Sequence, residues 1–345
     1  MATLEVNKTC TMIQKRNTNI EVLRLVLMLA IFSWHILVHG YGFKDIGGGN
    51  MEYLSDEVGI MLASLFAPAT YCFMFISGYY GLKFSFKKGF SLELWLIITS
   101  LLTYILGGYI FESISIRGIV TSCFPVSTLK WWFMTCYMLI FLLSPILNKG
   151  IESLNKNRFL MIIVSLVAYQ TFSFLRFHNN GGSNFLGLLT IFLVGRYFKI
   201  CNIQIKKKVA FTLFVACWIF LIALMLFADY YSKTHVFTLL NYNTPLIMTM
   251  AISLFYYVKG MTPSYSLVIN SFLKPVLFIY LITDGLFVPF YKWIVSVLHS
   301  DMILGVLLYV TIPIVCLLIG HTLIKLVDVL VSKINIKKIE EYVRQ

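Results

Sequence analysis

The stretch NIEVLRLVLMLAIFSWHILVHG, residues 19–40, decides the fold class of this chain. It is long and apolar enough to cross the hydrocarbon core of a bilayer as a helix, which takes about 20 residues. It nevertheless contains Glu21, Arg24, His35 and His39. Ionisable side chains are costly inside a membrane unless they face a bundle interior or a wet cavity, so the stretch predicts a helix with a functional role.

The whole chain has the composition of a polytopic membrane protein. Of its 345 residues, 59% are hydrophobic and only 12% are charged, and a water-soluble domain could not bury so much apolar surface in one core. We therefore predict an all-α integral membrane fold. Ten apolar runs are long enough to cross a bilayer. They lie near residues 19–40, 57–80, 91–111, 130–148, 158–175, 183–199, 209–230, 238–258, 272–295 and 302–331.

Basic residues indicate how these runs are oriented. If the N-terminus is cytoplasmic, the cytoplasmic segments hold 21 Lys and Arg and the opposite segments hold six. Such an excess marks the cytoplasmic side. We expect one membrane domain over residues 1–345, with spans over roughly 19–331, a cytoplasmic tail at 332–345 and both termini in the cytoplasm. The localisation expected is the inner (plasma) membrane, multi-pass, with the lipid bilayer as a partner.

The net charge of +13 does not indicate a nucleic-acid partner, because the basic residues fall between apolar runs and form no stripe beside exposed aromatics. The seven cysteines are scattered, mostly inside apolar runs, with no metal-ligand spacing. We interpret them as small buried side chains and expect no metal and no disulfide.

The polar residues of the first run share one helix face. Arg24 and His35 are eleven positions apart, which is three turns plus roughly 20° and about 16 Å along a helix axis. Glu21 precedes Arg24 by three positions and can pair with it. His35 lies deep in the run, where a neutral imidazole suits a general base. His39 is nearer the outer end and is interpreted as a solvated bystander.

This spacing of Glu, Arg and His resembles the signature of the membrane-bound acyltransferase family 3. FMFISGYYGLKFSFKK (residues 73–88) resembles the end of the second span and the basic loop of that family, and WWFMTCYMLIFLLSPILNK (131–149) resembles its fourth span. FLGLLTIFLVGRYFK (185–199), YNTPLIMTMAISLF and SFLKPVLFIYLITDG extend the resemblance over nearly the whole chain. It implies transfer of an acyl group, usually acetyl, from cytoplasmic acyl-CoA to a carbohydrate or glycolipid of the cell envelope.

The candidate site residues fall into three groups. The catalytic candidates are His35, Arg24 and Glu21; the candidates for binding acetyl-CoA as co-substrate are Lys83, Lys87, Lys88, Ser77 and Tyr79; the candidates for contacting the acceptor are Trp131, Tyr137 and Asp284. The chain departs from the family in having lysines where paired arginines are common, and YLIT where many relatives read YLIH. Lysine offers phosphate a point charge but lacks the bidentate fork of arginine.

Structural alternatives stay open for several of these residues. Ser77, Gly78 and Tyr79 fit a helix end with a glycine cap and an interfacial tyrosine. Trp131 and Trp132 fit an aromatic belt at the outer interface. A transporter or flippase of an envelope sugar or lipid fits the composition equally well, although the paired broken helices expected of a transporter are not evident. The oligomeric state is left open.

Overall fold

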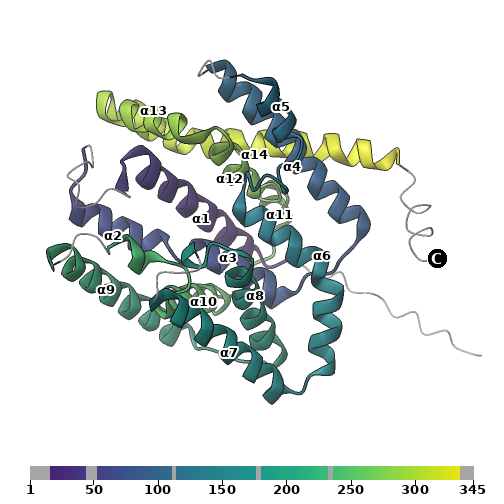
Figure 1. Ribbon diagram of the computed structural model, residues 1–345, viewed down its shortest axis with the longest axis vertical. Coiled ribbons are helices and arrows are strands. Elements are labelled where there is room, and N and C mark those ends of the chain that lie inside the picture. Colours follow the sequence, from purple (N-terminus) through teal and green to yellow (C-terminus); the bar gives the residue numbers. More distant parts are fainter. Residues whose placement is uncertain (1–15, 44–52, 111–113, 176–179, 232–235, 335–345) are drawn as a thin grey trace, which may run out of the picture.

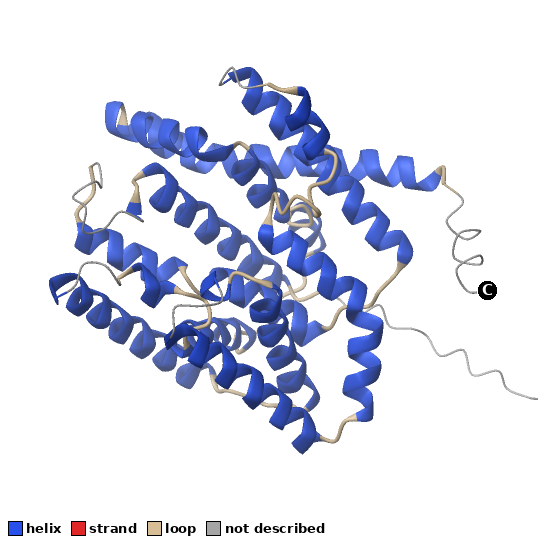
Figure 2. Cartoon of the chain, viewed as in Figure 1, coloured by secondary structure: helices blue, strands red, loops and turns tan. Residues whose placement is uncertain are grey.

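The computed structural model describes residues 16–43, 53–110, 114–175, 180–231 and 236–334, which form helices joined by turns and loops without a strand among them. Figures 1 and 2 show these helices packed into one bundle. The predicted all-α fold class is confirmed. The predicted tail at 332–345 lies outside the described residues from position 335 onward.

The elements follow one another along the chain in a fixed order. The helices are α1 (Thr18–His35), α2 (Asp56–Phe66), α3 (Ala69–Tyr80), α4 (Phe86–Ile110), α5 (Ile116–Ser122), α6 (Trp132–Ser153), α7 (Lys156–Leu175), α8 (Phe185–Ile200), α9 (Lys207–Tyr231), α10 (Pro245–Lys259), α11 (Leu267–Phe272), α12 (Leu277–Gly285), α13 (Phe287–Ser300) and α14 (Met302–Ser332). A π-turn, η1 (Ile36–Gly40), follows α1, and two 3₁₀ turns, η3 (Asn180–Gly182) and η4 (Phe237–Leu240), precede α8 and α10.

Helix α1 lies in the middle of the bundle. It begins at Asn17, whose side chain accepts a hydrogen bond from the backbone N–H of Asn19 at 3.0 Å. An asparagine in this position satisfies a backbone donor that a helix start leaves unpaired. The helix packs against α3, α10 and α12 (Figure 1). Its polar residues therefore face other helices, as predicted from the sequence of residues 19–40.

Seven helical segments within the described residues are long and apolar enough to cross a membrane. They are Thr18–Gly40, Asp56–Tyr80, Phe86–Ile110, Trp132–Ser153, Lys207–Tyr231, Leu267–Gly285 and Met302–Ser332. Three further predicted runs coincide with α7, α8 and α10, of which the last two contain only 16 and 15 residues. A membrane-spanning helical protein is thus supported, whereas the count of ten spans stays a prediction.

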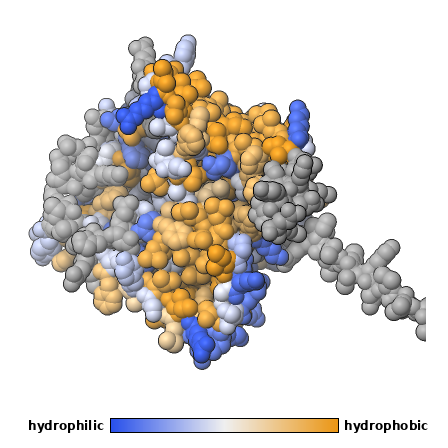
Figure 3. All heavy atoms as spheres, turned by 45° about the vertical axis from the view of Figure 1, so that its right-hand side comes forward, coloured by the Kyte–Doolittle hydropathy of each residue, from blue (hydrophilic) through white to orange (hydrophobic). Residues whose placement is uncertain are grey.

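The exposed apolar surface of the bundle agrees with a position in a membrane. Large apolar side chains are exposed along α9 and α14, and Figure 3 shows apolar atoms gathered over much of one face. Helix α1 begins, and helix α14 ends, on the right-hand side of Figure 1. The placement of that side in the cytoplasm stays a prediction from the charge distribution.

The ninth predicted run is divided among α11, α12 and α13. The sequence predicted an interruption from Asp284, Gly285 and Pro289, and the structure places it at Leu286, directly after Gly285. A Cβ added at Gly285 would meet the side chain of Thr103 on α4 at 2.7 Å. Glycine thus lets α12 approach α4 closely, and the break leaves Asp284 in the last turn of α12.

Helices α3 and α8 cross at two glycines. A Cβ added at Gly78 would overlap the carbonyl oxygen of Phe192, and one at Gly195 would meet the carbonyl oxygen of Phe75 at 2.6 Å. The interpretation of Gly78 as a helix cap is wrong, because α3 continues to Tyr80 and the capping glycine is Gly81, with φ of 80°. Gly78 instead serves close helix packing, for which small residues are favoured in membranes.

Candidate active site

The imidazole of His35 lies against a carboxylate and a phenol. Its Nδ1 is 3.3 Å from Oδ1 of Asp284 and 3.2 Å from Oη of Tyr291. The helix ends bring them together, because His35 closes α1, Asp284 lies at the end of α12 and Tyr291 lies in the second turn of α13. When Nδ1 carries the proton and donates it to the carboxylate, Nε2 is the basic atom of the ring.

Two further cationic or titratable groups surround Asp284. The ring of His39 lies 5.6 Å from that of His35 and stacks on Tyr291 at 5.8 Å, because the π-turn η1 turns it toward α13. His39 is thus part of the cluster and not a solvated bystander. The half-buried Lys130 donates hydrogen bonds from Nζ to the carbonyl oxygen of Ser100 at 3.0 Å and to Oγ1 of Thr103 at 3.3 Å. Both His39 and Lys130 lie within electrostatic range of Asp284.

A small space, which we call the His35 compartment, adjoins this cluster. Its volume is about 20 Å³, room for about one water molecule. Its walls are mainly aromatic and aliphatic, with a few hydroxyl groups. They are formed by Met28, Ile31, Trp34, His35, Phe66, Thr70, Trp132, Phe133, Tyr242 and Tyr280.

A second and much larger space, the cationic cavity, has a volume of about 640 Å³, within the range typical of small-molecule sites. Five basic and two acidic residues line it together with serines and aromatic side chains. The basic residues are Arg16, Arg24, Lys87, Lys88 and Lys274, and the acidic residues are Glu21 and Asp328. Phe133 lines both the cationic cavity and the His35 compartment, so the two spaces share a wall at this side chain.

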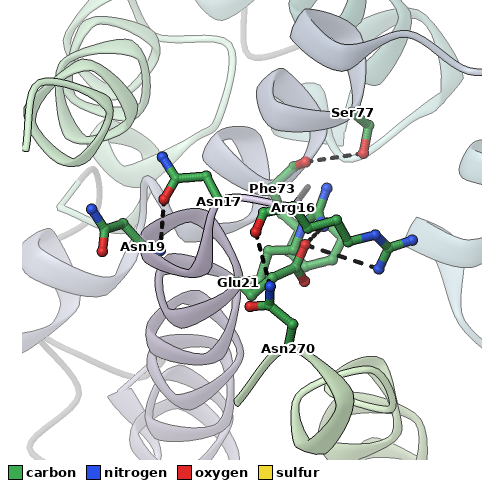
Figure 4. A network of polar contacts seen from close by, with 8 residues as sticks. Arg16, Asn17, Asn19, Glu21, Phe73, Ser77 and Asn270 are labelled. Atoms are coloured by element: carbon green, nitrogen blue, oxygen red, sulfur yellow. Dashed lines mark hydrogen bonds and ion pairs between the residues drawn. The ribbon is translucent and has the colours of Figure 1, made fainter. Parts of the chain in front are cut away.

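A polar network fixes the wall of the cationic cavity at the start of α1 (Figure 4). Arg24 Nη1 donates to Glu21 Oε1 at 2.8 Å, which confirms the predicted pair. Arg16 Nη1 lies 4.0 Å from the same oxygen. Asn270 on α11 donates from Nδ2 to the carbonyl oxygen of Arg16 at 2.8 Å. The buried Glu21 carboxylate therefore holds two guanidinium groups beside the cavity.

Several predicted binding residues lie on the wall of the cationic cavity. They are Ser77, Lys87, Lys88 and Tyr137. The hydroxyl of Ser77 donates to the carbonyl oxygen of Phe73 at 3.2 Å, and Figure 4 shows this bond. The predicted acceptor contact Asp284 lies instead at His35, in a position that can orient the imidazole.

Three predicted site residues lie away from the linings of both spaces. Lys83 is exposed on the loop between α3 and α4. Tyr79 is 3% exposed and lies under Lys199 and Lys259, whose Nζ atoms are 5.3 and 5.5 Å from its ring centre. Trp131 is 1% exposed, so the aromatic-belt interpretation is wrong for this residue. Its ring packs under the ammonium of Lys130 at 5.1 Å.

Sequence reasoning missed Arg16, Lys274 and two tyrosines. Arg16 and Lys274 belong to segments that the charge distribution assigned to the cytoplasm, and this was the only signal in the sequence that could have suggested them. Tyr280 precedes Asp284 by one helical turn and therefore shares its face, whereas the contact of Tyr291 with His35 depends on the break at Leu286. Within the described residues, no group of three or more His, Cys, Asp or Glu could hold a metal ion.

The fold and site define a multi-pass membrane protein in which a histidine–carboxylate pair adjoins a cavity suited to an anionic ligand. The model of the acyltransferase 3 family, an acyltransferase domain, matches residues 17–321. The chain belongs to this family and is a membrane acyltransferase. No curated protein and no solved structure matches it.

Proposed function

We propose that this acyltransferase moves an acetyl group from cytoplasmic acyl-CoA to a hydroxyl group of a cell-envelope or exported carbohydrate. The observation that carries the proposal is the position of His35, which faces Asp284 and lines a compartment that shares Phe133 with the cationic cavity. Family membership favours this reaction over the transporter suggested by composition alone.

The cationic cavity is the proposed donor site. Acyl-CoA carries several phosphate charges, and Arg16, Arg24, Lys87, Lys88 and Lys274 supply positive charge around one space. Four of them, Arg16, Lys87, Lys88 and Lys274, belong to segments that the charge distribution assigns to the cytoplasm, where acyl-CoA is available, whereas Arg24 lies within the first span. Arginine also binds phosphate in a bidentate manner. Lys83, Tyr79 and Trp131 are not assigned to binding, because they lie outside these walls.

The separation of Arg24 and His35 along α1 sets the distance between the proposed phosphate site and the proposed base. Arg24 and His35 lie on the same regular helix, so they are about 16 Å apart along its axis. The extended pantetheine arm is long enough for the phosphates to stay near Arg24 while the thioester reaches Phe133. The small volume of the His35 compartment, about 20 Å³, leaves no room for a long acyl chain.

His35 is the proposed general base. Its Nδ1–H donates to Asp284, which fixes the ring orientation and stabilises the imidazolium that forms during the reaction. Nε2 removes the proton of the acceptor hydroxyl, whose oxygen attacks the thioester carbon. The carbon–sulfur bond then breaks, and the CoA thiolate leaves and takes up the proton.

The test uses purified protein in lipid nanodiscs, supplied with acetyl-CoA and with glucose, galactose or N-acetylglucosamine as acceptor probes. Release of the CoA thiol and formation of the acetyl ester are measured. The wild type should show both, and His35→Ala should lose both while its abundance in the membrane is unchanged. His299→Ala is the control, because His299 lies at the end of α13 beside Tyr53 and outside both spaces. Full activity of His35→Ala would overturn the assignment.

A further inference from the structure

The hydroxyl group of Tyr280 is buried without a hydrogen-bond partner among the described residues. The residue is 5% exposed and lines the His35 compartment. Buried polar groups in native proteins are nearly always hydrogen-bonded, because an unpaired one destabilises the fold. A hydroxyl left unpaired on the wall of a reaction compartment is therefore a candidate for binding the reacting molecule.

The ring of Tyr280 lies between the proposed base and the wall that the compartment shares with the cationic cavity. Its ring centre is 6.0 Å from that of His35. The ring also meets Phe133 edge-on, with centres 6.4 Å apart and planes at 88°. Phe133 is the wall shared with the cationic cavity, so a thioester that passes it arrives beside Tyr280. The titratable groups facing the phenol are Asp284, Tyr291, Tyr242 and Cys136.

Tyr280 and Asp284 both lie on α12 but have different surroundings. The two residues are one turn apart and share a face of the helix. Asp284 holds Nδ1 of His35, whereas Tyr280 borders the compartment itself. One helix face thus carries both the carboxylate beside His35 and the hydroxyl group without a described partner.

We propose that Tyr280 is a second catalytic residue, whose O–H donates a hydrogen bond to the thioester carbonyl oxygen as that oxygen becomes an oxyanion. The inference rests on the proposed acyl transfer. As the acceptor oxygen bonds to the carbonyl carbon, the electron pair of the C=O bond moves onto oxygen, and the Tyr280 O–H stabilises it without losing its proton. The pair returns when the carbon–sulfur bond breaks and the thiolate leaves with the proton held by His35.

The matched experiment compares Tyr280→Phe with wild type and with Tyr309→Phe in nanodiscs. Tyr309 lies outside the compartment lining, and its hydroxyl group bonds Oγ of Ser33 at 2.6 Å. An oxyanion donor acts in the transition state, so Tyr280→Phe should lower kcat for CoA thiol release from acetyl-CoA roughly 100-fold and leave KM nearly unchanged. Tyr309→Phe should keep the wild-type kcat.

A thermal unfolding scan of the same proteins separates catalysis from structure. Removing an unpaired buried hydroxyl should leave the Tm of Tyr280→Phe equal to or above that of wild type. Wild-type kcat in Tyr280→Phe, a change in KM alone, or a fall in kcat matched by Tyr309→Phe would each overturn the inference. If Tyr280→Phe is fully active while His35→Ala is inactive, the proposed function stands and only the role of Tyr280 fails. If the wild type itself releases no CoA thiol, both fail.

Discussion

At the scale of single residues, the pairing of His35 with Asp284 explains how an imidazole can act as a base inside an apolar bundle. Nδ1 of His35 lies 3.3 Å from Oδ1 of Asp284, and when Nδ1 carries the proton this contact favours one tautomer and one ring orientation. Lys130 and His39 lie within electrostatic range of the same carboxylate. The family resemblance pointed to His35, whereas the tautomer depends on a residue from another helix.

Replacing Asp284 with Asn tests this arrangement. The amide nitrogen of the new side chain would face Nδ1 as a donor, which moves the imidazole proton to Nε2 and removes the base. We expect kcat to fall about 10⁴-fold, in line with the effect of such a change in a histidine–carboxylate pair. The measurement is CoA thiol release from acetyl-CoA by the purified variant.

Asp56→Asn provides the matched control, because Asp56 lies in the first turn of α2 and outside both spaces. It should keep the wild-type rate. An Asp284→Asn protein as active as the control would show that His35 does not need the carboxylate.

At the scale of elements, close helix contacts set the positions of the cavity walls. Helix α3 carries Phe73 and Ser77 into the cationic cavity, and its place is fixed by the crossing with α8 at Gly78 and Gly195. The backbone atoms at this crossing cannot move aside singly, so a side chain there forces the two helices apart.

Gly78→Ala should therefore lower stability by about 1–3 kcal/mol, the usual cost of overpacking, and Gly195→Ala should do the same. Thermal unfolding in detergent measures the effect as a lower Tm. Gly150→Ala is the control, because an added Cβ there meets no described atom within 4 Å and alanine has the higher helix propensity. Equal Tm values for Gly78→Ala and Gly150→Ala would contradict the packing role.

At the scale of the whole molecule, the distribution of charge agrees with the arrangement of the cavities. Except for Arg24 in the first span, the basic residues of the cationic cavity belong to chain segments that carry the cytoplasmic excess of Lys and Arg, whereas Lys130 near Asp284 belongs to an opposite segment. The donor would thus enter from the cytoplasm and the acceptor from the outer side.

This orientation can be measured with single cysteines in a background whose seven native cysteines are serines. Lys149→Cys should react with a membrane-impermeant maleimide only in inside-out vesicles, and Arg117→Cys only in intact cells or spheroplasts. Both side chains are exposed in the structure, so accessibility does not limit labelling. Labelling of both from one side would overturn the assignment of termini and cavities.

Sequence reasoning predicted the features that depend on local periodicity. The helical face of α1, the Glu21–Arg24 pair and the interruption near Gly285 follow from spacing and residue type. The contact of Asp284 with His35 could not be predicted, because it depends on how two helices far apart in the chain pack. The place of His39 depends on the π-turn after α1, for which the sequence carries no clear signal.

The contribution of Asp328 to the cationic cavity has a consequence for biosynthesis. This residue lies on α14, the last helix, whereas Arg16 and Arg24 come from the start of the chain. Ribosomes deliver helices to the membrane in order, so the cavity lacks a wall until the final span has inserted. The cationic cavity is therefore completed only when the last helix has joined the bundle.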